Sequence, residues 1–247
     1  MWPYFSTQYS GNPFGLFSPS HWIALTILVV LYLALFRFRR YFRGNHSADK
    51  TARFTIAFIL ILQESVLNIW RLVNGDWSIA TSLPLHLCGV AVLLSAIMMY
   101  NKNYFLYEIT FFWGLGGALQ ALITPDIGPY GFPHFRYFHF FVSHGTIILA
   151  SLYMTFVHRY RPQHKSVWKI FVLTNAYAVF IGFFNWVTGA NYLYICHKPE
   201  TSSMLDVMGP WPWYLVSLEV LALLSFYLYY SPFALRKKII DEESRAA

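Results

Sequence analysis

Seven apolar runs, most of them near the length that crosses a bilayer, dominate this sequence of 247 residues. A transmembrane helix needs about 20 mostly apolar residues. The runs cover His21–Phe36, Ala52–Leu72, Leu83–Met99, Tyr104–Ile123, Arg136–Val157, Val167–Val187 and Trp213–Tyr230. Charged residues make up only 12% of the chain, which is about half the share in soluble domains, so they are too few to cover a water-facing surface. We therefore predict an all-α, polytopic membrane protein: a single domain, residues 1–247, folded as a seven-transmembrane-helix bundle.

The basic residues alternate between the connections. All but three of the 18 Lys and Arg residues lie in 37–53, at 102, in 159–169 or in the tail from 236. The exceptions are Arg71, Arg136 and Lys198. Because cytoplasmic connections are enriched in Lys and Arg, we predict that the N-terminus lies outside and the C-terminus in the cytoplasm of a multi-pass protein of the cell membrane. The formal net charge of +7 is then a topology signal, and we expect no nucleic-acid partner.

Two further features concern the connections and the first run. Residues 1–20 contain no Lys or Arg, so we expect the first run to be a retained helix rather than a signal peptide. The outer connection 124–135 contains Pro125, Pro129 and Pro133 and cannot be regular helix. The connection 188–212 is long enough to act as a lid or binding loop, although an interfacial loop held by its aromatic residues would explain it equally.

Polar side chains gather in the half of the bundle that we expect to face outward. An ionisable side chain inside a bilayer is costly, so it marks a candidate functional site. Glu64, Asn68 and Arg71 are spaced to share one face of the second helix. Other helices contribute at the same depth His86, Cys88, Arg136, His139, His144 and Asn185. The simple alternative is that Glu64 pairs with Arg71 and the others form interhelical hydrogen bonds, but we expect a cavity that opens outward.

Cys88 is the most reactive residue type in this set. Pro84 suits the first turn of a helix, which would place Cys88 about one turn into the third helix, where the helix dipole lowers the pKa of a thiol. A nucleophilic thiol needs a nearby base. His86 would point to the other side of the same helix, and His139 and His144 lie about 140° apart around theirs, so only one of these two should face Cys88. A packing role for the cysteine is the alternative.

Metal and cofactor sites fit the sequence less well. Histidine ligands on one helix favour i, i+3 or i, i+4 spacing, and His139 and His144 are five apart. A haem between His86 and one of these histidines would need both to lie at equal depth. The seventh run contains no lysine that could form a retinal Schiff base. We therefore expect no metal and no cofactor.

Four short stretches carry a family resemblance. They are Leu83–Cys88, Ser143–Gly145, Gly189–Tyr192 and Gly209–Tyr214. Together they resemble the YwaF-type family of bacterial integral membrane proteins, over nearly the whole chain. That family is similar to the animal transmembrane protein 164, described as an acyltransferase that builds polyunsaturated ether phospholipids. The resemblance implies seven helices, and a cysteine on the third helix with a histidine on the fifth, which here match Cys88 and His144.

The residues and the resemblance together predict an intramembrane lipid acyltransferase or acyl-ester hydrolase whose partners are membrane lipids. Cys88 would be the nucleophile and His144 the general base, with oxyanion donors from the start of the third helix. Arg71 or Arg136 could hold a lipid phosphate. The rest of the predicted cavity consists of Glu64, Asn68, His86, His139 and Asn185. The alternative function is a small-solute transporter or membrane sensor that binds in the same cavity without chemistry.

Overall fold

The computed structural model describes residues 3–199 and 204–246, with side chains described at 3–199 and 205–235. Within these residues the protein is helical and has no β-strand. The main helices are α1 (Pro19–Gly44), α2 (His46–Val73), α3 (Leu87–Asn101), α4 (Tyr104–Trp113), η2 (Gly114–Ala118), α5 (Leu119–Ile123), α6 (Phe135–Phe156), α7 (His164–Thr188) and α8 (Trp213–Ala246). Short 3₁₀ turns occur at Pro3–Phe5, Tyr192–Tyr194 and Met204–Met208.

Most of these helices have the length and composition of membrane spans. In the described part of the chain, six are long and apolar enough to cross a membrane, counting α4, η2 and α5 as one continuous helix, Tyr104–Ile123. Helix α3 is apolar but has only 15 residues. The protein is therefore a membrane protein with several apolar helices, as predicted.

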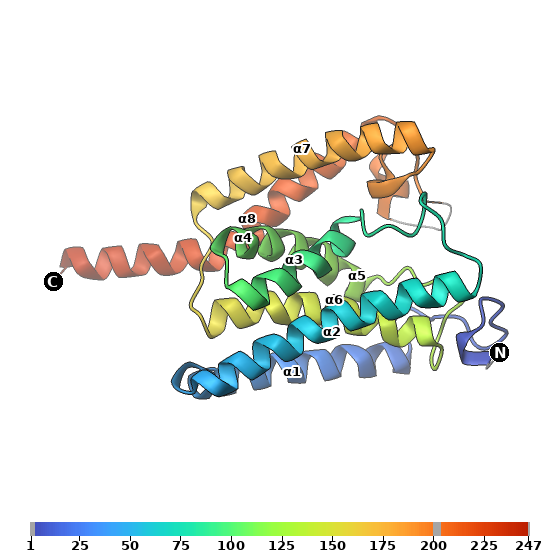
Figure 1. Cartoon of the computed structure of the whole chain (residues 1–247). Helices are drawn as coiled ribbons and strands as arrows, with labels where there is room; N and C mark the ends of the chain where they lie inside the picture. Colours follow the sequence, from blue (N-terminus) through green and yellow to red (C-terminus); the bar gives the residue numbers. More distant parts are fainter. Residues whose placement is uncertain (1–2, 200–203, 247) are drawn as a thin grey trace.

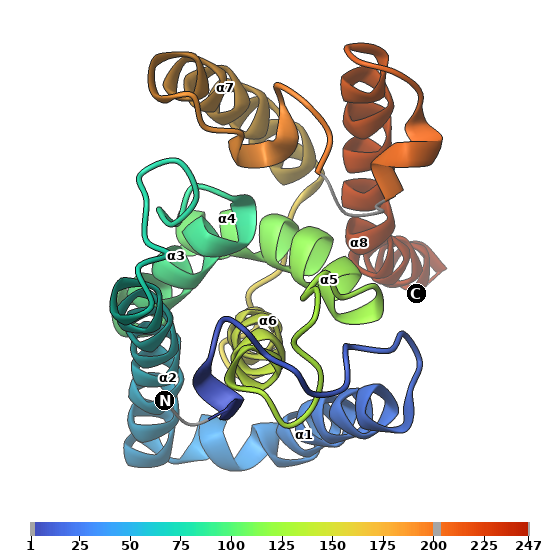
Figure 2. The same ribbon diagram turned by 90° about the vertical axis from the view of Figure 1, so that its right-hand side faces the viewer.

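The helices run back and forth between two ends of the molecule, and the termini lie at opposite ends (Figure 1). We call one end the short-loop end, because it holds the connections at 45, 102–103 and 157–163. The other, the long-loop end, holds 3–18, 74–86, 124–134, 189–199 and 204–212. Seen from the long-loop end, α6 is surrounded by α1, α2, α3 and the α4–α5 helix, while α7 and α8 stand beyond α4–α5 (Figure 2).

Helix α6 is central because small residues let its neighbours approach closely. At Gly145, an added Cβ atom would lie 2.4 Å from Leu28 Cδ2 of α1. The Tyr32 hydroxyl of α1 also donates to the Gly145 carbonyl oxygen at 3.0 Å. The Ser151 hydroxyl donates to the Thr110 carbonyl oxygen of α4 at 3.1 Å. These contacts fix α1 and α4 against α6.

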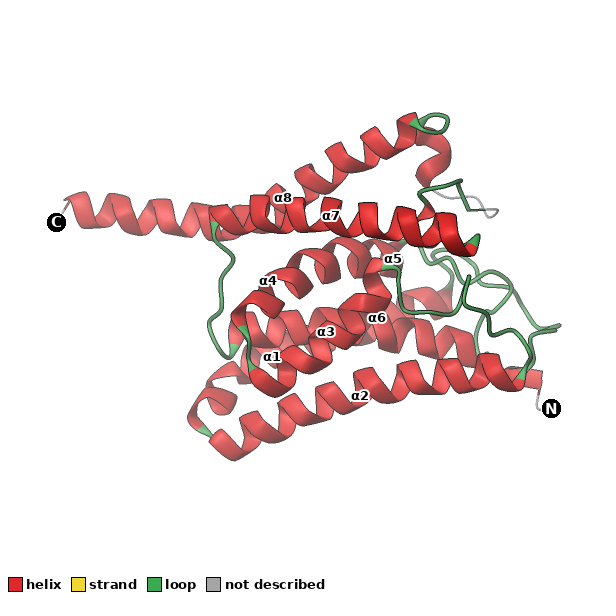
Figure 3. Ribbon diagram, turned by 45° about the horizontal axis from the view of Figure 1, so that its top comes forward, coloured by secondary structure: helices red, strands yellow, loops and turns green. Residues whose placement is uncertain are grey.

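Helices α7 and α8 stand apart from this core, and they diverge from each other toward the long-loop end (Figure 3). Their exposed faces are strongly apolar, with Val179, Trp186 and Leu228 among the most exposed large side chains. Polar contacts hold them at a few points. Trp113 Nε1 donates to Thr174 Oγ1 at 2.8 Å, and Asn175 Nδ2 of α7 donates to Glu219 Oε2 of α8 at 2.8 Å.

Several helix boundaries differ from those predicted. Helix α1 continues through its arginines to Gly44, and α8 continues to Ala246, because basic residues are good helix formers even where hydropathy falls. Helix α3 begins at Leu87, four residues later than predicted. The residue before a proline is pushed toward extended backbone, and here the chain stays non-helical from Leu83 through His86.

Candidate functional site

Cys88 is the second residue of α3, so it lies in the first turn rather than one turn further in. His86 is the N-cap, and the first helical hydrogen bond runs from Val90 N to His86 O at 3.0 Å. In the described part of the chain, no acceptor reaches the backbone N–H groups of Leu87, Cys88 and Gly89. Such free N–H groups at the positive end of a helix are able to bind an anion.

The thiol packs against a π-helical segment that the sequence analysis missed. In the segment η2, an added Cβ atom on Gly117 would lie 2.9 Å from Cys88 Sγ, so a larger residue there would have to displace the thiol. Single-turn π-helices inside α-helices are frequent at functional sites. The signal available in the sequence was the glycine cluster at 114–117, in the middle of a predicted span.

His144 has a defined tautomer. Its Nδ1 lies 2.8 Å from the Phe140 carbonyl oxygen. A carbonyl oxygen only accepts, so Nδ1 carries the proton in a neutral ring, and Nε2 has a free lone pair. No described residue forms a hydrogen bond with Nε2, and none joins this ring to the Cys88 thiol. The side chain therefore has the protonation pattern of a general base.

Helix α2 carries the predicted row of polar residues. Asn68 Nδ2 donates to the Glu64 backbone oxygen at 2.9 Å and to Glu64 Oε1 at 3.2 Å. Arg71 Nη1 donates to the Ser82 carbonyl oxygen at 3.3 Å. Arg71 and Arg136 lie within electrostatic range of Glu64, yet neither forms an ion pair with it in the described structure.

Two of the predicted cavity residues hold a loop in place. The Asn185 amide bonds to both backbone groups of Tyr192, with Nδ2 donating to Tyr192 O at 2.9 Å and Oδ1 accepting from Tyr192 N at 3.0 Å. The His86 ring packs at 5.2 Å from the Tyr192 ring and 5.3 Å from the Tyr194 ring. The Tyr192 hydroxyl in turn donates to Ile79 O at 2.8 Å. These contacts attach 189–195 to the connection 74–86.

The N-terminal segment 3–18 lies across the long-loop end of the helices (Figure 2). Trp70 Nε1 donates to Phe5 O at 2.7 Å, and the His134 ring donates from Nε2 to Ser6 O at 3.0 Å. Burial lowers the pKa of His134, so its ring stays neutral, and Nδ1 accepts from Arg136 N at 3.1 Å. Residues 3–18 contain no long apolar run, so nothing in their sequence predicted that they would cover this end.

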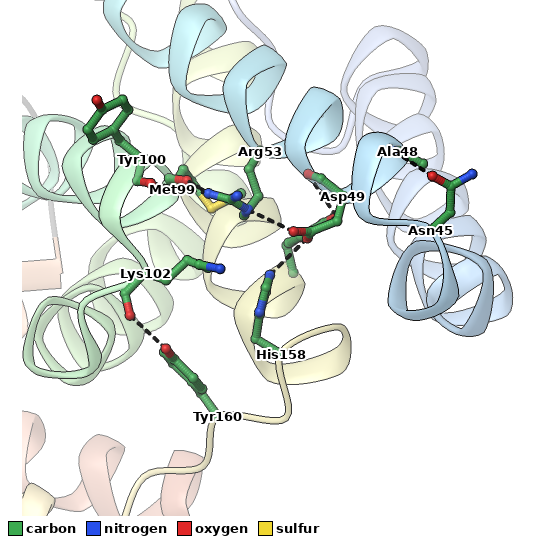
Figure 4. Close-up of polar contacts among 10 residues, drawn as sticks. Asn45, Ala48, Asp49, Arg53, Met99, Tyr100, Lys102, His158 and Tyr160 are labelled. Atoms are coloured by element: carbon green, nitrogen blue, oxygen red, sulfur yellow. Dashed lines mark hydrogen bonds and ion pairs between the residues drawn. The ribbon is translucent and has the colours of Figure 1, made fainter.

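The short-loop end contains a buried charge network centred on Asp49 (Figure 4). Asp49 Oδ2 accepts from Arg53 Nε at 3.1 Å, and Asp49 Oδ1 accepts from His158 Nε2 at 2.8 Å and the Tyr153 hydroxyl at 2.9 Å. Arg53 Nη1 also donates to Met99 O at 2.5 Å. Glu108 is also buried; it accepts from Ser166 and Lys169 of α7. In the sequence, the i, i+4 spacing of Asp49 and Arg53 is the feature that could have indicated the network around Asp49.

Neither a disulfide nor a cluster that could bind a metal ion is found among the described residues. Cys88 and Cys196 are both free cysteines. Within the described residues, no three His, Cys, Asp or Glu side chains are grouped so that they could hold a metal ion.

The comparisons with known proteins give one match. No curated protein and no solved structure matches the chain. The TMEM164 family model matches residues 16–230, a range that contains Cys88, His144 and both arginines of the long-loop end. A match over this much of the sequence establishes membership, and the chain therefore belongs to the TMEM164 family.

Proposed function

We propose that this protein is an intramembrane enzyme that acts on a lipid acyl ester, by transfer or hydrolysis, with Cys88 as the nucleophile and His144 as the general base. It would cross the cell membrane seven times, with its long-loop end facing outward. One observation carries the proposal: the Cys88 thiol lies in the first turn of α3, beside three backbone N–H groups that have no acceptor in the described structure. Those groups could stabilise the oxyanion of an acyl intermediate.

The first half of the reaction forms an acyl-enzyme. The thiol proton passes to His144 Nε2, and the thiolate attacks the carbonyl carbon of the ester. The tetrahedral oxyanion receives hydrogen bonds from the start of α3. The ester C–O bond then breaks, and the leaving alcohol takes the proton from His144, which leaves an acyl-thioester on Cys88.

The second half returns the enzyme to its starting state. An acceptor hydroxyl, or water in the case of hydrolysis, gives its proton to His144 Nε2 and attacks the thioester carbonyl. The C–S bond breaks, and the proton returns to the Cys88 sulfur. Transfer and hydrolysis therefore use the same residues and differ only in the acceptor.

The test compares purified wild-type protein with Cys88→Ala, Cys88→Ser and His144→Ala on a phospholipid with a fluorescent acyl chain. Cys88→Ala should abolish acyl release and the acyl-thioester adduct that mass spectrometry detects on the wild type. His144→Ala should slow the reaction by about 10²–10⁴-fold, the usual effect of losing a positioned base. Cys196→Ala is the matched control and should retain activity, because this thiol is exposed on the 189–212 connection. Undiminished acyl release by Cys88→Ala would disprove the thiol mechanism.

The second candidate is a carrier or sensor that binds a small solute without chemistry. It is favoured by the polar chain that runs from Glu64 through Asn68 to the indole of Trp77, whose Nε1 donates to Asn68 Oδ1 at 3.2 Å. Labelling with a lipid-like electrophile separates the two candidates. An enzyme of the proposed type should react selectively at Cys88, whereas a carrier should show no such selectivity.

A further inference from the structure

Arg136 presents an unused set of hydrogen-bond donors. The residue lies in the first turn of α6, and its side chain forms no hydrogen bond or ion pair with any described residue. The Arg136 Cζ lies 6.0 Å from the centroid of the Trp70 ring. A guanidinium has five N–H donors, and leaving it unpaired in a membrane is costly. An acceptor from outside the described chain would remove this cost.

His139, on the same face of α6, also has a side chain without hydrogen bonds to the described residues. Both of its ring nitrogens are buried and have no hydrogen-bond partner within the described residues. It follows Arg136 at i, i+3 spacing, so the two side chains share a helix face. One nitrogen of a neutral imidazole must donate and the other must accept, so this site also requires a polar group that the described chain does not supply.

Arg71 brings a second guanidinium to this place from α2. It lies within electrostatic range of Arg136 and of His139. Among the described residues its guanidinium has one hydrogen-bond partner, the Ser82 carbonyl oxygen, which accepts from Nη1 at 3.3 Å. The acidic groups in range of Arg136 are Glu64 and Asp76, and neither pairs with it in the described structure. Glu64 Oε1 instead accepts from Asn68 Nδ2 at 3.2 Å.

We infer that Arg71, Arg136 and His139 form a binding site for a phosphate group. Arginine is suited to this ligand because its planar fork of donors matches two phosphate oxygens at once. The His139 ring would donate to a third oxygen and accept from a hydroxyl or water beside it. His144 lies within electrostatic range of both Arg136 and His139, so a phosphate bound there would also lie within electrostatic range of the proposed general base.

This inference extends the proposed function by naming the part of the lipid that the enzyme would hold, but the binding can be measured without turnover. The phosphate could belong to a lipid headgroup or be free in solution. The assay is equilibrium binding in a neutral detergent, with three probes: dihexanoyl phosphatidic acid, dihexanoylglycerol without the phosphate, and inorganic phosphate as a competitor.

Wild-type protein should bind the phosphatidic acid at least about tenfold more tightly than the dihexanoylglycerol. Arg136→Gln and His139→Phe should each weaken binding of the phosphatidic acid about tenfold, because hydrogen bonds to charged groups are among the stronger ones. Their double variant should lose less than the sum of both effects, since the two residues would hold one group. Arg136→Lys keeps the charge without the fork and should lie between the wild type and Arg136→Gln.

Two further variants test whether a change in binding comes from the phosphate site rather than from net charge alone. Lys198→Gln removes one positive charge from the same end of the molecule and should bind as the wild type does. Glu64→Gln removes a nearby negative charge and should bind the phosphate more tightly. Equal binding of the two lipids, or unchanged binding by well-folded Arg136→Gln and Arg136→Lys, would overturn the inference.

The remaining outcomes identify the source of the phosphate and separate this inference from the proposed function. Displacement of the lipid by inorganic phosphate at equal concentration would support the site and indicate a free phosphate. A lipid that resists displacement would support the site and indicate a headgroup. Cys88→Ala should bind the phosphatidic acid as the wild type does. If Cys88→Ala binds this lipid and also retains acyl release, the thiol mechanism is disproved while the phosphate site is still supported.

Discussion

At the scale of single residues, Asp49 shows how this protein stabilises charges inside its helices. Its carboxylate accepts hydrogen bonds from Arg53 on its own helix, from Tyr153 on α6 and from His158 just beyond α6 (Figure 4). Arg53 then reaches the last carbonyl groups of α3, at Met99 and Tyr100. One ion pair thus joins α2, α3 and α6 at the short-loop end.

We predict that Asp49→Asn destabilises the folded protein by about 3–5 kcal/mol, because it leaves the buried Arg53 charge without its partner. Thermal unfolding in detergent, followed by circular dichroism, would measure the loss. The adjacent Lys50→Gln is the control, since Lys50 is exposed and its substitution also changes the net charge by one unit, in the opposite direction. A melting temperature for Asp49→Asn equal to that of the control would show that the network contributes little.

At the scale of secondary structure, the π-helical segment η2 decides where the thiol can lie. Its extra residue per turn displaces the α4–α5 helix locally, and Gly117 then faces Cys88 closely enough that an added Cβ atom would lie 2.9 Å from Sγ. At Gly116, one residue away, an added Cβ atom would meet Tyr229 Cε2 at an ordinary 3.8 Å. The two glycines therefore form a natural matched pair.

We predict that Gly117→Ala pushes the Cys88 thiol from its position and lowers its reactivity, while Gly116→Ala leaves it unchanged. Both substitutions raise helix propensity by about the same amount, so a difference between them must come from the contact with Cys88. The measurement is the rate at which a maleimide labels Cys88, in a background where Cys196 is replaced by Ala. Equal labelling rates in the two variants would argue against a thiol constrained by η2.

At the scale of the whole molecule, the two ends differ in the length of their connections and in the residues they hold. The short-loop end has brief connections and most of the basic residues, whereas the long-loop end holds the thiol, the two arginines and the covering segment 3–18 (Figure 1). The apolar faces of α7 and α8 are exposed, as expected for helices that a bilayer surrounds. This division gives the proposed orientation a physical basis in the positive-inside rule.

We predict that the C-terminus is cytoplasmic and the N-terminus is outside. Green fluorescent protein fused after Ala247 should fluoresce, and alkaline phosphatase at the same position should be inactive. The reciprocal fusions at the N-terminus should give the opposite pattern. Phosphatase activity after Ala247 would reverse the orientation and place the Cys88 site on the cytoplasmic side.

The sequence by itself determined the membrane class and the approximate helices, and it singled out Cys88 and His144 as candidates. These depend on local properties: the length of an apolar run, the spacing of basic residues and short motifs. Tertiary structure alone decided which groups meet. It placed Cys88 against Gly117, turned the Asn185 amide onto Tyr192, and left the side chains of Arg136 and His139 without a hydrogen bond to any described residue. It also joined Asp49 to His158 across 109 residues of sequence. Such contacts depend on how distant helices pack, and periodicity along one helix gives each side chain a direction but cannot name its neighbour.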